Sequence, residues 1–408
     1  MRRPQSGLGA IDLVWLVAGW LVIWIGLTPA REQPGSPEEL VRRLGDADFR
    51  VRESASQALV RLGHKALPAL EAGMQHPDPE IRRRCRELYP QALVYDLEEK
   101  IKRFLAATDE RSDAGLPGWQ QFRALVGNDP AAKRFYADVV RQGHTLLDKV
   151  ERASRSEELR LKQQAQEEYV QLCNSLFQQA FANTTGLPEV ILPEQFALAL
   201  LLSSFPSNNG AVIPQGRQIY QLCNHTSVRR FLQEKSEQAR ILRRLMVGVA
   251  ERSTDPACLQ QVLYLALSVE FPEIVSLARR QAENKELNAY ARGLALTVVC
   301  KYAGKQEFDF LERFLADTTQ VSVNRFARGN DQITIRTEIR DLALALLIDV
   351  TGQRLQDYSF PALQLLGVSP QMRPSQAYNP HWYGFSSEEE REAALKKWRQ
   401  WRSDHPQP

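Results

Sequence analysis

Apolar residues recur at intervals of three and four along most of the chain, and this spacing predicts helices. The longest such pattern covers residues 157–182 and has the separate apolar and polar faces of an amphipathic helix. Shorter apolar patterns predict further helices at 193–204, 237–250, 257–268 and 272–282. The hydrophobic pattern therefore predicts an all-α fold.

One stretch follows a different period. Residues 321–335, "VSVNRFARGNDQITI", alternate between apolar and polar on both sides of Gly329-Asn330. Alternation of period two is typical of a strand with one buried face, and a pair of glycine and asparagine suits a tight turn. The sequence therefore predicts a small β-hairpin near 321–335 in an otherwise helical chain.

The C-terminal tail combines aromatic residues with a signal for a helix start. Ser386 and Glu389 have the spacing of a capping box, and the helix after them places Trp398 and Trp401 on one face. Just upstream, "YNPHWYGF" (378–385) holds further aromatic residues beside a proline and a histidine. We expect this segment to strap the last helix onto the rest of the protein, and the alternative is a recognition loop.

A short pattern recurs within the first hundred residues. Arg52 follows a valine, has an alanine three positions later, and has Asp48 four positions earlier. Thirty residues on, Arg82 follows an isoleucine, has a cysteine three positions later, and has Asp78 four positions earlier. Self-similarity at a fixed period is the sequence signature of a repeat architecture.

The pattern returns near the C-terminus. Arg292 and Arg340 are each followed by alanine at +3 and by an apolar residue at +7. Gly304 and Gly352 then stand at +12, where a glycine is expected to stop the helix. A single pair of such helices cannot bury both of its apolar faces, whereas stacked pairs can, so the repeat predicts an α-solenoid.

The segment "DADFRVRESASQALVRLGHKALPALEAGMQHPDPEIRRRCREL" resembles HEAT repeats of the short bacterial type, with their D-x-x-V-R-x-x-A-x-x-A-L core. The whole chain resembles exported or membrane-anchored bacterial proteins that carry HEAT repeats. The resemblance implies a ladder of aspartates and arginines between adjacent repeats. The later units depart from it, with Asn288 and Arg336 where the aspartate is expected. The residues assigned to this structural ladder are Asp48, Arg52, Asp78, Arg82, Arg292 and Arg340.

The N-terminus carries the signal for location. Arg2 and Arg3 precede an unbroken apolar run at 13–27, whose length lies between that of a signal peptide and that of a full membrane span. The run is either an uncleaved anchor or a signal peptide cleaved near Ala30. In both cases the positive-inside rule keeps the two arginines in the cytoplasm and exports the rest, as a membrane-anchored or a free periplasmic protein.

Composition and motifs limit the kinds of partner and active site that the protein is expected to have. The net charge of +3 over 408 residues argues against nucleic acid as a partner. The five cysteines and six histidines have no metal-binding spacing, and no nucleophile or phosphate-loop motif is present, so we expect no metal, cofactor or catalytic residue. Arg83 and Arg84 form a possible interaction surface for an anionic partner, although Glu80 and Glu87 flank them.

These patterns together predict a non-enzymatic α-solenoid scaffold that mediates protein–protein interaction in the bacterial cell envelope. One alternative is a HEAT-like enzyme of the lyase or hydrolase type, with its site in the middle of the chain. The other is a mechanical or spacing protein without a stable partner. The expected segments are a signal or anchor (1–30), a linker (31–36), HEAT repeats (37–95), a helical region without repeat signature (97–255), HEAT-like repeats (256–360) and the C-terminal tail (361–408).

Overall fold

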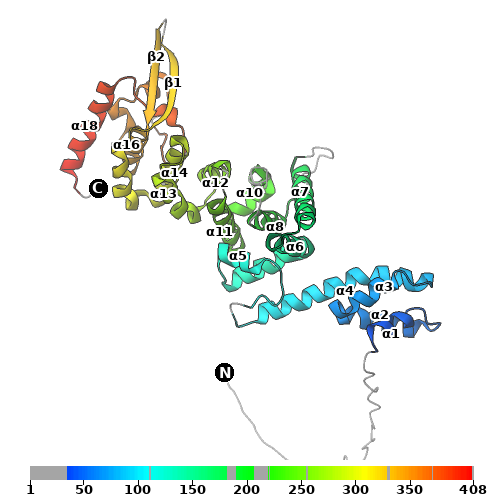
Figure 1. Cartoon of the computed structure of the whole chain (residues 1–408). Coiled ribbons are helices and arrows are strands. Elements are labelled where there is room, and N and C mark those ends of the chain that lie inside the picture. Colours follow the sequence, from blue (N-terminus) through cyan, green and yellow to red (C-terminus); the bar gives the residue numbers. More distant parts are fainter. Residues whose placement is uncertain are drawn as a thin grey trace, which may run out of the picture. The chain divides into compact units, whose positions relative to one another are not determined.

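The computed structural model describes residues 35–109, 112–181, 190–205, 219, 221–253, 256–328, 331–369 and 371–406 (Figure 1). Helices predominate in these ranges and two strands pair as an antiparallel hairpin, which confirms the mostly helical fold with a hairpin. The predicted signal or anchor lies outside the described residues. Within the described ranges, every helix falls short of the length or the apolarity that a membrane crossing demands.

The chain divides into two compact units, Met1–Glu98 and Glu99–Pro408. In the first unit, Ala55 and Leu59 belong to a buried core that also holds Leu70. The elements of this unit are α1 (Pro37–Arg43), α2 (Phe49–Leu62), the 3-10 turn η1 (Gly63–Ala66), α3 (Leu67–Gly73) and the first part of α4 (Pro79–Ala106).

The helix α4 differs from the predicted organisation. It runs without interruption from Pro79 to Ala106, so the boundary expected between 37–95 and 97–255 falls inside one helix. The chain has no glycine from position 74 to position 114 that could act as a helix stop, and the helix continues past Pro90. The second occurrence of the sequence pattern therefore lies at the start of a single long helix.

The second unit contains more helices than the first, and it also contains the hairpin (Figure 1). The inward-facing residues of its central helices are fully buried, among them Leu294 on α14 and Leu342 on α16. The helices are α5 (Trp119–Val126), α6 (Pro130–Arg155), α7 (Leu159–Phe181), α8 (Pro193–Ser203), α10 (Thr226–Gln233), α11 (Glu237–Arg252), α12 (Pro256–Ser268), α13 (Val275–Glu283), α14 (Ala289–Ala303), α15 (Phe308–Glu312), α16 (Ile339–Val350), α17 (Pro361–Leu365) and α18 (Glu388–Asp404). The 3-10 turns are η2 (Leu222–Asn224), η3 (Pro272–Ile274), η4 (Gly304–Glu307), η5 (Arg313–Ala316), η6 (Leu355–Tyr358) and η7 (Pro380–Trp382).

The same local design appears at α2 and at α14. Each helix ends at a glycine with nearly identical backbone angles, φ 54° and ψ −126° at Gly63 and φ 52° and ψ −126° at Gly304. In both places a 3-10 turn (η1 or η4) and a short helix (α3 or α15) follow. Gly352, after α16, also has a positive φ of 72°. The glycine stops predicted from the sequence are confirmed, and the sequence repeat corresponds to a repeated backbone path.

Replacing Gly304 with alanine is expected to lower the free energy of unfolding by about 1–3 kcal/mol, because side chains rarely adopt its backbone angles. A built Cβ would meet no other group within 4 Å, so the loss would come from the backbone alone. Urea denaturation followed by far-UV circular dichroism measures the change. An unchanged midpoint would show that the turn relaxes without cost.

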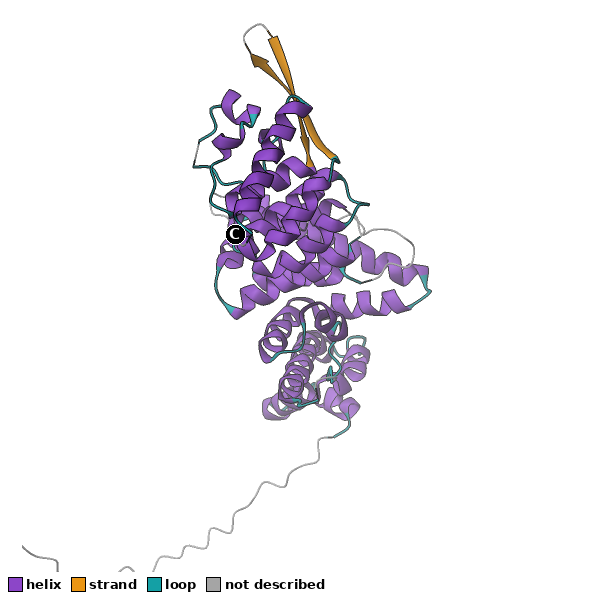
Figure 2. Cartoon of the chain, turned by 90° about the vertical axis from the view of Figure 1, so that its left-hand side faces the viewer, coloured by secondary structure: helices purple, strands orange, loops and turns teal. Residues whose placement is uncertain are grey.

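The hairpin is inserted between η5 and α16 and extends away from the helices of its unit (Figure 2). Its strands are β1 (Gln320–Arg328) and β2 (Asp331–Glu338), and Val323 lies opposite Arg336 in their register. The turn at 329–330 lies outside the described residues. One face of the hairpin buries Ile335 and Thr337, and the other face is exposed at Val323 and Arg336.

The C-terminal segment packs on the rest of its unit. Trp398 is buried against Phe308, with ring centroids 6.0 Å apart, and Tyr383 and Phe385 are also buried. Tyr383 and Phe385 pack against Phe360, and the guanidinium of Arg391 on α18 lies over the Phe385 ring, 5.8 Å from its centroid, which agrees with the predicted strap. The helix start lies one residue later than predicted, because the hydroxyl of Ser387 accepts the N-terminal backbone hydrogen bond of α18.

Candidate functional site

In the first unit, the side chains assigned to the ladder form hydrogen bonds with backbone groups at the start of their own helix or in the turn directly before it. The Nη1 atom of Arg52 donates to the carbonyls of the residues five and six positions earlier, at 2.9 and 2.7 Å. Arg82 repeats this arrangement at 2.6 and 2.7 Å. The carboxylates of Asp48 and Asp78 each accept the backbone N–H two residues later, at 2.8 Å. These contacts hold the start of α2 and of α4, and they lie within each repeat rather than between repeats.

Arg292, in the second unit, does link successive helical elements. Its side chain is buried on α14, and its Nε donates to the carbonyl of Ala282 at the end of α13, at 3.0 Å. Its Nη2 donates to a carboxylate oxygen of Asp317, 2.5 Å away, in the segment that leads into the hairpin. Arg292 therefore ties its own helix pair to the next element along the chain.

The hairpin separates Asp317 from Arg340 in the sequence, so the spacing of four residues between aspartate and arginine is not visible there. Excising residues 320–338 would leave only Thr318, Thr319 and Ile339 between Asp317 and Arg340. Asp317 would then stand four positions before Arg340, the spacing that Asp48 has from Arg52. The aspartate expected at position 336 is thus present before the insertion, and Arg336 is a hairpin residue.

Arg340 and Arg391 join α16 to α18. Arg340 donates to Glu338 at 2.7 Å and to Glu388 on α18 at 2.8 Å. Arg391, buried on α18, donates from Nε and Nη2 to the two carboxylate oxygens of the fully buried Asp341, at 2.8 and 3.2 Å. The repeat pattern identifies Arg340 but gives no indication of the Arg391–Asp341 pair.

A further buried arginine, Arg243 on α11, has the same kind of contacts as Arg292. Its Nη1 donates to the carbonyl of Leu232 at the end of α10, at 2.8 Å. Its Nε and Nη2 donate to the carboxylate of Glu273 on η3, at 2.9 and 3.0 Å. Sequence analysis missed Arg243 because it lies seven residues after the cap of its helix, whereas Arg292 lies four residues after its cap.

Arg83 and Arg84, the possible interaction surface, pair within α4. Arg83 contacts Glu80 at 2.9 Å and Glu87 at 2.7 Å, and Arg84 contacts Glu80 at 2.6 Å. The flanking carboxylates that the sequence places beside them are therefore their partners. Surface pairs of this kind contribute little to stability and reduce the positive field offered to a ligand.

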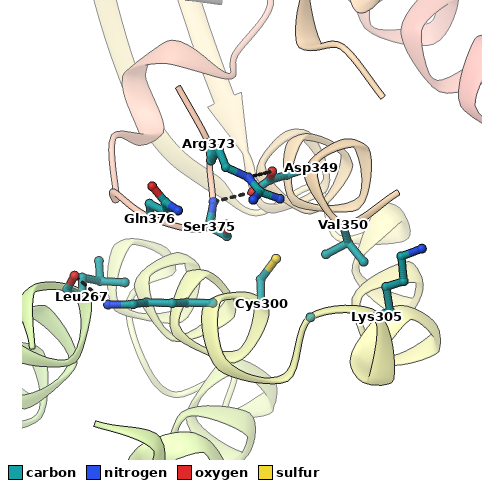
Figure 3. Close-up of a pocket in the computed structure, with 10 residues that line it drawn as sticks. Leu267, Cys300, Lys305, Asp349, Val350, Arg373, Ser375 and Gln376 are labelled. Carbon is teal, nitrogen blue, oxygen red and sulfur yellow. Dashed lines mark hydrogen bonds and ion pairs between the residues drawn. The ribbon is translucent and has the colours of Figure 1, made fainter. Parts of the chain in front are cut away.

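A cavity of about 680 Å³ in the second unit has a mixed polar and apolar lining (Figure 3). Leu267 from α12, Cys300 from α14, Asp349 from α16 and the segment that holds Arg373 form its walls. The side chain of Arg373 donates from Nε to Asp349 at 2.9 Å, and the backbone N–H of Ser375 donates to the same carboxylate at 3.0 Å.

The reactive groups of this cavity have structural partners. The Cys300 thiol contacts the carbonyl of Leu346 at 3.8 Å, and burial, with a further contribution from Asp349, raises its pKa far above neutral pH. The Lys301 ammonium donates to two carbonyls at the end of α12, at 2.7 and 2.9 Å, and burial lowers its pKa. Cys300 is therefore a neutral thiol with little nucleophilic character.

The exposed face of the hairpin is a second candidate. We define the hairpin outer face as Val323, Arg325, Ala327, Gln332, Thr334 and Arg336, which the register places on one side of the two strands. The side chain of Val323 is 46% exposed. The guanidinium groups of Arg325 and Arg336 are exposed and make no ion pair or hydrogen bond within the described part of the chain. The face is therefore basic and partly apolar.

Cysteines and histidines do not combine into a site where the structure describes them. All five cysteines are buried, and none of them forms a disulfide. Burial raises the pKa of Cys223, and the ring of the neighbouring His225 contacts the Ser227 hydroxyl at 2.8 Å. Among the described residues, no group of three histidine, cysteine, aspartate or glutamate side chains is placed to hold a metal ion.

Comparison of the chain with known protein families, with curated proteins and with solved structures finds no match.

Proposed function

We propose that this protein is a non-enzymatic α-solenoid scaffold that binds a partner protein in the bacterial cell envelope. The shared backbone path at Gly63 and Gly304 supports the repeat. Arg243 and Arg292 support the stacking, since each bonds to the end of the preceding α-helix and to a carboxylate that lies beyond the next α-helix along the chain. The apolar run at 13–27 supports the location.

The state of the cavity residues supports a binding role over an enzymatic one. A nucleophilic cysteine needs a lowered pKa, whereas burial raises the pKa of Cys300. A lysine that acts as a general base needs a neutral amine that is free to accept a proton, whereas the Lys301 side chain donates hydrogen bonds to two carbonyls at the end of α12. Both side chains serve the packing of the helices that carry them.

The single observation that carries the proposal is the hairpin outer face. The guanidinium groups of Arg325 and Arg336 have no partner among the described residues, and the exposed Val323 lies directly opposite Arg336 in the register. Two unpaired arginines beside apolar groups on an extended β-ribbon complement an acidic, extended segment of another protein. Charge complementarity of this kind sets partner choice and association rate.

A photo-crosslinking amino acid placed at Val323 is expected to give a specific adduct in native membranes. The crosslinked partner peptide should be rich in aspartate and glutamate, because it lies beside Arg325 and Arg336. Charge reversal of both arginines to glutamate should lower the adduct yield at least about 10-fold, since like charges across an interface cost several kcal/mol. Mass spectrometry of the adduct identifies the peptide.

Val190 provides the matched control, because it is also an exposed valine of the second unit, with 68% of its surface accessible. The same crosslinker at Val190 should give no adduct with that partner. Equal adducts from both positions would contradict the proposal. So would a yield at Val323 that does not respond to charge reversal.

A further inference from the structure

The cavity beside α14 contains polar groups that the packing of the protein does not use. Arg373 binds Asp349 through Nε alone, so its Nη1 and Nη2 atoms have no partner among the described residues. The Lys305 ammonium is likewise without a described partner and is exposed. The side chain of Gln376 lies on the same wall as Arg373 (Figure 3).

The guanidinium of Arg373 is held in place although 57% of the side chain is exposed. Its anchor, Asp349, is 7% exposed and is also fixed by the backbone N–H of Ser375. An arginine oriented by a buried carboxylate presents its remaining N–H groups as a fork of fixed direction. Such a fork matches the geometry of a carboxylate or a phosphate.

The charges of the lining favour an anion. Among the described residues of the lining, Lys301, Lys305 and Arg373 are cationic and Asp349 alone carries a carboxylate, so two positive charges are in excess. The ends of α12 and α14 point their carbonyls toward this region, which opposes an anion. The Lys301 ammonium, however, binds the carbonyls of Ala266 and Leu267 and offsets that field.

We propose that this cavity binds a small organic or inorganic oxyanion, with Arg373 and Lys305 as the residues that contact it. The volume of about 680 Å³ falls in the range of small-molecule sites. Gly304 lies in the lining with open space where a Cβ would stand, so the ligand can approach the backbone there. This site is separate from the hairpin outer face and does not depend on a protein partner.

The test is calorimetric titration of the purified full-length protein with succinate and, separately, with inorganic phosphate. Saturable binding of either probe is expected, and a preference between the two assigns the group as carboxylate or phosphate. The variant Arg373→Gln should bind the preferred probe about 10- to 100-fold more weakly, because it loses charge-assisted hydrogen bonds. Binding should also weaken as salt is added.

The matched control is Arg354→Gln. Arg354 also pairs with an aspartate, Asp357, but is 77% exposed and does not line the cavity, so its loss should leave the affinity unchanged. If Arg373→Gln fails to fold, Lys305→Gln provides the test, since Lys305 has no described partner to lose, and its affinity should fall several-fold. The absence of saturable binding by either probe overturns the proposal, as does equal affinity in the Arg373 and Arg354 variants.

Discussion

Replacing Arg391 with alanine is expected to lower the free energy of unfolding by about 3–5 kcal/mol, because it leaves a buried carboxylate without its partner. Arg391 is 4% exposed, and the Asp341 that it binds is 0% exposed. The substitution also removes the hydrogen bond from Arg391 to the carbonyl of Arg336, at 3.1 Å, at the base of the hairpin. Urea denaturation measured by circular dichroism gives the change.

The effect of Arg391→Ala should depend on pH. Burial raises the pKa of Asp341 to about 6, although the hydrogen bonds of Arg391 act to lower it. Because this pKa lies above the unfolded value of about 3.9, the folded state binds the proton more readily, and the contribution of Asp341 to stability falls as pH rises from about 4 to about 6. Without Arg391 the pKa of Asp341 rises further, so the destabilisation should be smaller at pH 5 than at pH 8.

Arg399 offers the control for this prediction, since it lies on the same helix. Its side chain is 63% exposed and contacts Glu392 at 3.4 Å. Arg399→Ala should change the free energy of unfolding by no more than about 0.5 kcal/mol. Similar losses in the two variants would mean that α18 does not depend on the buried pair.

Asp317→Ala is expected to lower the free energy of unfolding by about 3 kcal/mol, because it leaves the buried cation of Arg292 without a carboxylate. Burial acts to raise the pKa of Asp317, but hydrogen bonds from Thr319 and Arg292 outweigh it, and the pKa lies below its ordinary value. The unfolded state therefore takes up the proton first on acidification, so the contribution of Asp317 is present above about pH 4 and is lost below it.

The pH series distinguishes this pair from a general packing defect. The stability difference between the natural protein and Asp317→Ala should shrink as pH falls below about 4. Asp309, an exposed aspartate on α15, supplies the control, and Asp309→Ala should stay within about 0.5 kcal/mol of the natural protein. A difference that persists unchanged into acid would contradict the role assigned to the Asp317 carboxylate.

Local sequence patterns were enough to predict the features that depend on neighbouring residues. The helices, the hairpin at 321–335 and the glycine stops at Gly304 and Gly352 depend on periodicity and on backbone preference, which a short window contains. The boundary expected near residue 96 falls inside α4, which has no glycine stop there, and it lies close to the division between the two units after Glu98.

The contacts that join the elements could not be predicted in the same way. Arg391 binds a carboxylate 50 positions away, and Arg243 binds one 30 positions away, so neither pair lies within a recognisable local motif. Asp317 was hidden by the inserted hairpin. The cavity combines residues from Leu267 to Gln376 on four separate segments, and only their folding together places Arg373 beside Asp349.

The two ends of the hairpin meet closely, since the N–H of Ile339 donates to the carbonyl of Thr319 at 3.0 Å. The chain could therefore be joined directly from Thr319 to Ile339 if residues 320–338 were removed. The backbone N–H of Arg340 already donates to the carbonyl of Asp317, at 2.9 Å, so these two residues would stay adjacent. The hairpin thus leaves the helical unit and returns to it at almost the same point. A change in the length or sequence of the ribbon beyond its buried base would leave the hydrogen bond between Thr319 and Ile339 in place.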